Sequence, residues 1–111
     1  MKMLRSDGSE IATDKDGFLK KLSDWSPQTA DLLAAQCDIN LSDAHWELIT
    51  LVQNYYQQFG LSPAMRPLVK YAKQELGAAK GTSRYFLQHF PASPAKLLSK
   101  IAGLPRPDNC L

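Results

Sequence analysis

The feature that most constrains the fold of this chain is a repeated helix signal, a serine followed directly by a proline. The pair occurs at Ser26-Pro27, Ser62-Pro63 and Ser93-Pro94. Serine at an N-cap accepts a backbone hydrogen bond and proline fits the first helical position, so each pair predicts a helix start. Glycines stand where three helices are expected to end, at Gly60, Gly77 and Gly103. This punctuation predicts a mainly α protein.

Apolar residues recur at helical spacing between these signals, which predicts a compact bundle of about five short helices over 26–102. We expect the helices at 27–37, 43–59, 63–76, 83–90 and 94–102. Pro67 conflicts with a regular third helix, which should begin late or kink there. Asp7-Gly8 lies between two strand-like pieces and predicts a small β-hairpin within 1–13. The remaining residues, 103–111, are expected to form a mobile C-terminal arm.

Length and composition predict one domain, 1–111. The chain has 44% hydrophobic and 22% charged residues, as ordinary soluble domains do. No apolar run approaches the roughly 20 residues that a membrane span needs, so we expect a cytoplasmic protein without membrane contact. Residues 1–53 carry five basic and nine acidic side chains, whereas 54–111 carry eight basic and two acidic. The C-terminal half is therefore expected to meet a polyanion or an acidic partner.

Few side chains are candidates for chemistry. The two histidines, His45 and His89, have no further ligands at metal spacing, so we expect structural roles and neither a metal nor a cofactor. Asp14 to Gly17 indicates a turn, because the later ligands of a calcium loop are missing. Cys37 lies in an apolar run and is interpreted as a small buried hydrophobe.

Cys110 stands one residue from the end. A cysteine near a terminus is more often incidental than reactive. If the arm begins at Gly103, the seven residues to Cys110 extend about 23 Å from the body. Pro105 and Pro107 favour a stiff extended segment, which predicts a thiol held away from the surface.

A basic cluster in the third and fourth expected helices admits a different function. Its possible docking residues are Arg66, Lys70, Lys73, Lys80 and Arg84. Helices at this spacing are compatible with a helix-turn-helix that binds nucleic acid. A solvated basic face, or a protein-docking face, is the preferred interpretation.

The C-terminal run Lys-Ile-Ala-Gly-Leu-Pro-Arg-Pro-x-x-Cys-Leu, residues 100–111, resembles the signature of the DsrC/TusE family of sulfur-carrier proteins. Further matches span the chain in the family's order: His45-Trp46, Tyr55-Tyr56, Phe59, Ser62-Pro63, Arg66, Lys70, Lys80-Gly81, Ser83-Arg84-Tyr85, Phe90-Pro91 and Pro94-Ala95. Ser99 stands where the DsrC branch has a second arm cysteine, so the chain is similar to the TusE branch. Ser93, Arg106 and Asp108-Asn109 depart from the family pattern and concern the shape of the arm.

This resemblance implies a sulfurtransferase that carries a persulfide on Cys110, and not a stand-alone multi-turnover catalyst. It implies a TusBCD-like donor complex upstream and a tRNA thiolase downstream, possibly with bound tRNA, in the formation of wobble 2-thiouridine. The expected arm and partner-docking residues are Lys100, Gly103, Pro105, Arg106 and Pro107. The alternatives are a helix-turn-helix-like nucleic-acid-binding regulator, or a DsrC-like partner protein of sulfite reduction or sulfur oxidation.

Overall fold

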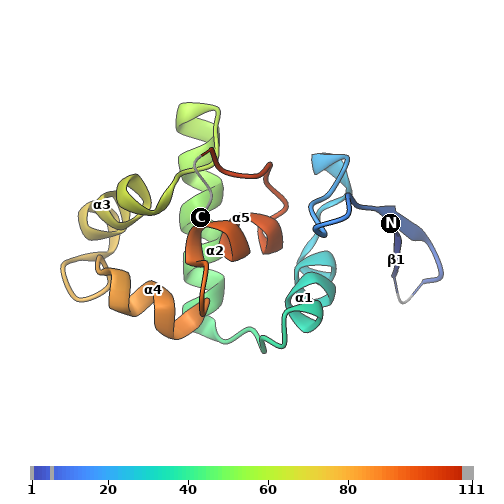
Figure 1. The fold of residues 1–111 in the computed structure, drawn as a ribbon, viewed down its shortest axis with the longest axis horizontal. Helices are drawn as coiled ribbons and strands as arrows, with labels where there is room; N and C mark the ends of the chain where they lie inside the picture. Colours follow the sequence, from blue (N-terminus) through green and yellow to red (C-terminus); the bar gives the residue numbers. More distant parts are fainter. Residues whose placement is uncertain (1, 6, 109–111) are drawn as a thin grey trace.

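The computed structural model describes residues 2–5 and 7–108, and in this part of the chain five α-helices follow an N-terminal hairpin (Figure 1). The elements, in order, are β1 (Lys2–Leu4), β2 (Glu10–Ala12), the 3-10 turn η1 (Leu22–Asp24), α1 (Pro27–Gln36), α2 (Asp43–Phe59), α3 (Met65–Leu76), α4 (Ser83–His89) and α5 (Pro94–Ile101). The predicted fold class, a mainly α protein with a small N-terminal hairpin, is confirmed.

The hairpin pairs β1 with β2 in antiparallel register, with Met3 opposite Ile11. Both of these side chains are buried and join the hydrophobic core. Asp7 builds the turn, because its Oδ1 accepts a hydrogen bond from the Ser9 backbone N–H at 2.9 Å. The hairpin lies at one end of the molecule and α3 and α4 lie at the other (Figure 1).

Side-chain caps start three of the helices as expected. Ser26 Oγ accepts from the Thr29 N–H at 3.2 Å, and Thr82 Oγ1 accepts from the Tyr85 N–H at 3.1 Å. Ser42 forms a reciprocal capping box with His45 at the start of α2. These hydrogen bonds satisfy donors that a helix N-terminus otherwise leaves unpaired.

The other two Ser-Pro pairs behave differently from the prediction. α3 begins at Met65 with Ala64 as its N-cap, so Ser62-Pro63 precedes the helix without capping it. The late start agrees with the conflict raised by Pro67, which now stands at the third helical position, inside the first turn, where no intrahelical donor is required. Ser93 precedes Pro94 at the start of α5 but makes no side-chain cap hydrogen bond.

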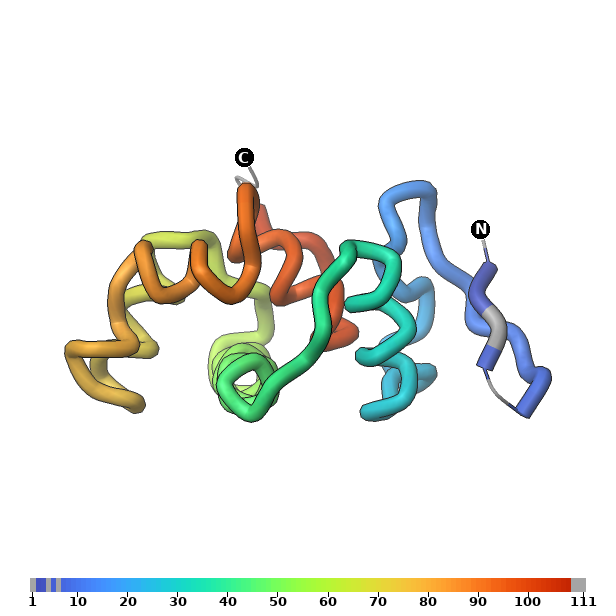
Figure 2. The backbone as a smooth tube through the Cα atoms, turned by 90° about the horizontal axis from the view of Figure 1, so that it is seen from below, coloured from blue at the N-terminus to red at the C-terminus, as the bar shows by residue number. Residues whose placement is uncertain are grey.

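Helix α5 is the centre of the bundle. It contacts α1, α2, α3 and α4, and the tube view shows it between α1 and α4 and beside α2 (Figure 2). Leu98 and Ile101 of α5 are fully buried, as are Leu48 and Val52 of α2. Burial of such side chains is the main favourable contribution to folding. The residues that follow α5 therefore leave from the middle of the core.

His45 joins the start of α2 to the end of α4. Its Nε2–H donates to the His89 carbonyl at 2.9 Å, so its Nδ1 is left to accept from the Ser42 N–H at 3.1 Å. The rings of His45 and His89 lie edge to face with centroids 5.0 Å apart. Burial lowers the pKa of His45 below its ordinary value of 6.5. The hydrogen bond that Nδ1 accepts from Ser42 requires the neutral ring, whereas the one from Nε2–H to His89 does not.

Acidification should therefore weaken the fold through His45. The folded protein binds this proton less readily than the unfolded chain, so the stabilisation is complete above pH 6.5 and is lost as the pH falls below it. Between about pH 7.5 and pH 5 we expect the free energy of unfolding in urea to drop by about 1 kcal/mol, the usual contribution of a helix cap. His45→Gln can still accept from Ser42 but does not titrate, so its pH dependence should be flatter. Equal slopes in both proteins would contradict this assignment.

Candidate functional site at the root of the C-terminal arm

The end of α5 is a Schellman motif built on Gly103. The Gly103 N–H donates to the Lys100 carbonyl at 3.1 Å, and the Leu104 N–H donates to the Ser99 carbonyl at 2.9 Å. Gly103 has φ +79°, a left-handed conformation that glycine adopts without strain. The prediction that the helix ends before Gly103 is confirmed.

Two side chains from distant elements hold this helix end. The Trp25 indole N–H donates to the Ile101 carbonyl at 2.8 Å, and the Gln53 amide N–H donates to the Ala102 carbonyl at 3.0 Å. A Cβ added to Gly103 would lie 2.4 Å from Trp25 Cδ1. Sequence reasoning missed both Trp25 and Gln53, although the indole N–H of a half-buried tryptophan usually needs an acceptor.

Gly103→Ala should consequently destabilise the protein more than an ordinary substitution of a positive-φ glycine. Gly60 is the matched control, because it has φ +74° and nothing within 4 Å of an added Cβ. Gly60→Ala should lower the free energy of unfolding by about 1 to 2 kcal/mol from backbone strain alone. Gly103→Ala adds the collision with Trp25, so urea unfolding should show a clearly larger loss. Equal losses would mean that Trp25 yields freely.

The segment after Gly103 lies on the body, which corrects the expectation of an arm that leaves the surface at this residue. Leu104 is 6% exposed and belongs to the core, and Pro107 is also buried. Ser62 Oγ donates to the Pro105 carbonyl at 2.6 Å. Tertiary contacts therefore decide where this proline-containing segment lies. From Pro107 the three residues to Cys110 extend at most about 10 Å.

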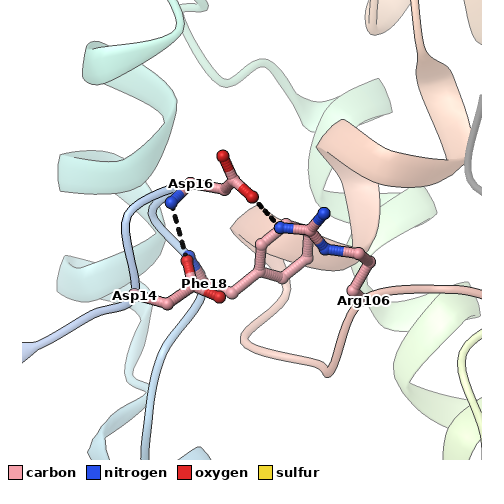
Figure 3. Close-up of polar contacts among 4 residues, drawn as sticks. All are labelled: Asp14, Asp16, Phe18 and Arg106. Carbon is pink, nitrogen blue, oxygen red and sulfur yellow. Dashed lines mark hydrogen bonds and ion pairs between the residues drawn. The ribbon is translucent and has the colours of Figure 1, made fainter.

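Arg106 is bound by the N-terminal turn. Its guanidinium forms an ion pair with the Asp16 carboxylate and lies over the Phe18 ring, 5.2 Å from the centroid (Figure 3). Lys100 Nζ approaches the same ring at 5.6 Å. The hydrogen bond from Arg106 lowers the pKa of Asp16. We call Asp16, Phe18 and Arg106 the Arg106 clamp.

The carboxylate of Asp14 shapes the turn that carries this clamp, as Figure 3 shows. Its Oδ1 accepts from the Asp16 N–H at 2.8 Å and from the Phe18 N–H at 3.0 Å. The Gly17 N–H donates to the Asp14 carbonyl at 3.0 Å. The interpretation of these residues as a turn is confirmed, but its contact with the C-terminal segment was not predicted.

The cysteines fall in different places. Cys110, the predicted reactive residue, lies outside the described residues. Cys37 is half-buried at the C-cap of α1 and lines a cavity of about 240 Å³ with Lys15 and Lys100, so it is less buried than expected. Ser99, at the position of the second arm cysteine in the DsrC branch, is fully buried and its Oγ has no hydrogen-bond partner within the described residues. An unpaired buried hydroxyl costs stability.

The five predicted basic docking residues differ in their surroundings. Arg66, Lys70 and Lys73 of α3 and Arg84 of α4 are exposed. Lys80 instead forms an ion pair with Glu47 at 2.6 Å, and this hydrogen bond raises the pKa of Lys80. The basic face therefore lies on α3 and α4, away from the hairpin end (Figure 1).

An apolar groove of about 370 Å³ lies between helix α4 and Pro107 of the C-terminal segment. Its lining includes Met65, Leu87, Pro94, Lys96 and Pro107. Among residues 2–5 and 7–108 there is no cluster of three or more His, Cys, Asp or Glu side chains that could hold a metal ion. In the same residues no helix is long and apolar enough to cross a membrane.

Known proteins resemble this chain over its full length. A family model described as DsrC like protein matches residues 5–111. Sulfurtransferase TusE of Photorhabdus laumondii is 49% identical and both chains are covered completely. The Sulfurtransferase TusE homolog of Haemophilus influenzae is 48% identical, over 98% of this chain and 100% of its own. The NMR structure of Allochromatium vinosum DsrC has a TM-score of 0.88 at 38% identity, with both chains fully covered.

The fold described above, a helical bundle with an N-terminal hairpin, is the fold of the solved DsrC structure. This chain belongs to the DsrC-like family. The resemblance inferred from residues 100–111 and from the motifs upstream is confirmed.

Proposed function

We propose that this protein is a sulfur-relay sulfurtransferase that accepts persulfide sulfur on Cys110 and passes it to a downstream acceptor. Full-length similarity to proteins named Sulfurtransferase TusE supports the activity. The observation that carries the proposed site is the burial of Leu104 and Pro107, which holds the chain on the body until three residues before Cys110. The short span that ends in Cys110 therefore starts from a defined position on the body, at Pro107.

The reaction needs only one cysteine. The Cys110 thiolate attacks the terminal sulfur of a donor persulfide, the donor's S–S bond breaks, and the donor cysteine leaves as a thiolate. The new S–S bond leaves a persulfide on Cys110, and no oxidant or reductant is consumed. A second thiolate then takes the terminal sulfur in the same way. The protein is thus a persulfide carrier that turns over only together with its partners.

The proposed partners are a TusBCD-like donor complex and a tRNA thiolase with or without bound tRNA, in the formation of 2-thiouridine at the wobble position in the cytoplasm. Exposed cations on α3 and α4 support docking of an acidic partner surface, since Arg66, Lys70 and Arg84 have no ion pair assigned to them in the described residues. The groove beside Pro107 is lined in part by the same two helices, through Met65 of α3 and Leu87 of α4.

The helix-turn-helix alternative has weaker support. Of the four basic residues on which it depends, Lys70, Lys73, Lys80 and Arg84, Lys80 is paired with Glu47. A role in sulfite reduction or sulfur oxidation would use the second arm cysteine of the DsrC branch, and this chain has Ser99 there, sealed in the core. The names of the relatives at 48% and 49% identity favour sulfur transfer.

Cys110→Ser should abolish sulfur acceptance without changing the melting temperature. The test incubates the full chain with a cysteine desulfurase and radiolabelled cysteine, and follows both the label and the gain of one sulfur atom by mass spectrometry. Loss of acceptance should be complete, because the hydroxyl cannot form a persulfide.

Cys37→Ser is the matched control for this experiment. It removes the other thiol of the chain but lies at the C-cap of α1, so acceptance should persist. Label that remains on the Cys110→Ser chain and disappears from the Cys37→Ser chain would reverse the assignment of the two cysteines.

A further inference from the structure

We propose that Asp16 and Phe18 are positioning residues for the sulfur-carrying terminus, acting through Arg106. The inference rests on the proposed function of Cys110, which follows Arg106 by four residues. Asp16 and Arg106 are 90 residues apart in sequence, so their ion pair ties the turn that follows the hairpin to the C-terminal segment. The Arg106 clamp thereby sets the point from which the terminus reaches its partners.

Contacts within the turn itself hold the two groups that meet Arg106. Asp14 Oδ1 holds the backbone N–H groups of both Asp16 and Phe18, and Thr13 is bridged to Leu19 across the base of the turn. Phe18 is only 3% exposed, so its ring is fixed by packing. A carboxylate and an aromatic face arranged in this way suit a guanidinium, which donates its N–H groups to the carboxylate and lays its plane against the ring.

The clamp is one of three attachments on consecutive residues. The Pro105 carbonyl accepts from Ser62, Arg106 is held by Asp16 and Phe18, and Pro107 is buried. The prolines on both sides of Arg106 have restricted φ, so a fixed Arg106 fixes the direction of the segment. The attachments come from separate parts of the chain, since Ser62 follows α2 and Asp16 precedes α1.

Stability alone does not explain this arrangement. The side chains of Asp16 and Arg106 are 31% and 44% exposed, and a single exposed ion pair contributes little to global stability. The same pair decides how much chain is free. If the segment detaches back to Leu104, the span to Cys110 grows from three residues to six. The effective concentration of a tethered group falls as about the −3/2 power of the tether length. Doubling the free span should therefore slow the reaction of Cys110 with a docked protein partner about threefold.

The first experiment measures the terminus directly. A nitroxide is attached to Cys110 in the full chain carrying Cys37→Ser, and its mobility is measured by electron paramagnetic resonance with and without Asp16→Asn. Mobility should rise in Asp16→Asn while urea unfolding stays unchanged. Glu10→Gln is the matched control, because Glu10 forms an exposed ion pair with Lys2 at 3.2 Å inside the hairpin and none with Arg106. This control should leave the label's mobility unchanged.

Two further readouts separate positioning from a merely structural role. High salt, which shortens the screening length to about 3 Å at 1 M, should mobilise the label in the parent chain but not further in Asp16→Asn. The combination of Asp16→Arg with Arg106→Asp should restore low mobility that each single change loses. Identical mobility in the parent chain and in Asp16→Asn, or a swap that restores nothing, would overturn the proposal.

The second experiment measures transfer. Asp16→Asn should accept sulfur from a persulfide-loaded cysteine desulfurase about threefold more slowly. Its Cys110 should react with a small aromatic disulfide at the parent rate, because the thiol itself is unchanged. Equal slowing with both reagents, or with neither, would contradict positioning. If the parent chain accepts no sulfur, the proposed function fails, and the spin-label result still decides whether the clamp holds the terminus.

Discussion

The close contact between Gly103 and Trp25 is the constraint on which the rest of the structure depends. Helix α5 is surrounded by four other helices, so the chain can leave the core only where a helix end fits under another side chain. Gly103 provides that place, because it adopts a left-handed φ and leaves room for the indole. The indole in turn satisfies the Ile101 carbonyl, which a helix end leaves unpaired.

The route of the C-terminal segment follows from this exit. Leu104 completes the core directly after the turn, and Ser62, Asp16 and Phe18 then line the path as far as Pro107. The described residues are attached to the body as far as Pro107. Cys110, the proposed carrier of the sulfur, follows three residues later in the sequence.

His45 and Asp16, which each join distant segments of the chain, differ in how their contacts depend on protonation. His45, between α2 and α4, accepts from Ser42 only as a neutral ring, so this contact depends on the pH below 6.5. Asp16 has its pKa lowered by Arg106 and stays ionised at every physiological pH. The contact near α4 is therefore expected to weaken on acidification, and the clamp is expected to weaken in high salt.

The sequence by itself determined the helical class, the hairpin and the ends of most helices, because caps, glycines and apolar spacing act within a few residues. The family, and Cys110 as the candidate for sulfur transfer, came from the resemblance of residues 100–111 and of the motifs upstream to known proteins. Only the tertiary structure decided that Ser62 binds Pro105 instead of capping α3, that Lys80 pairs with Glu47, and that Arg106 lies against Asp16 and Phe18. These contacts join residues far apart in the chain, and their partners are selected by which surfaces the packed core brings together, which no local pattern encodes.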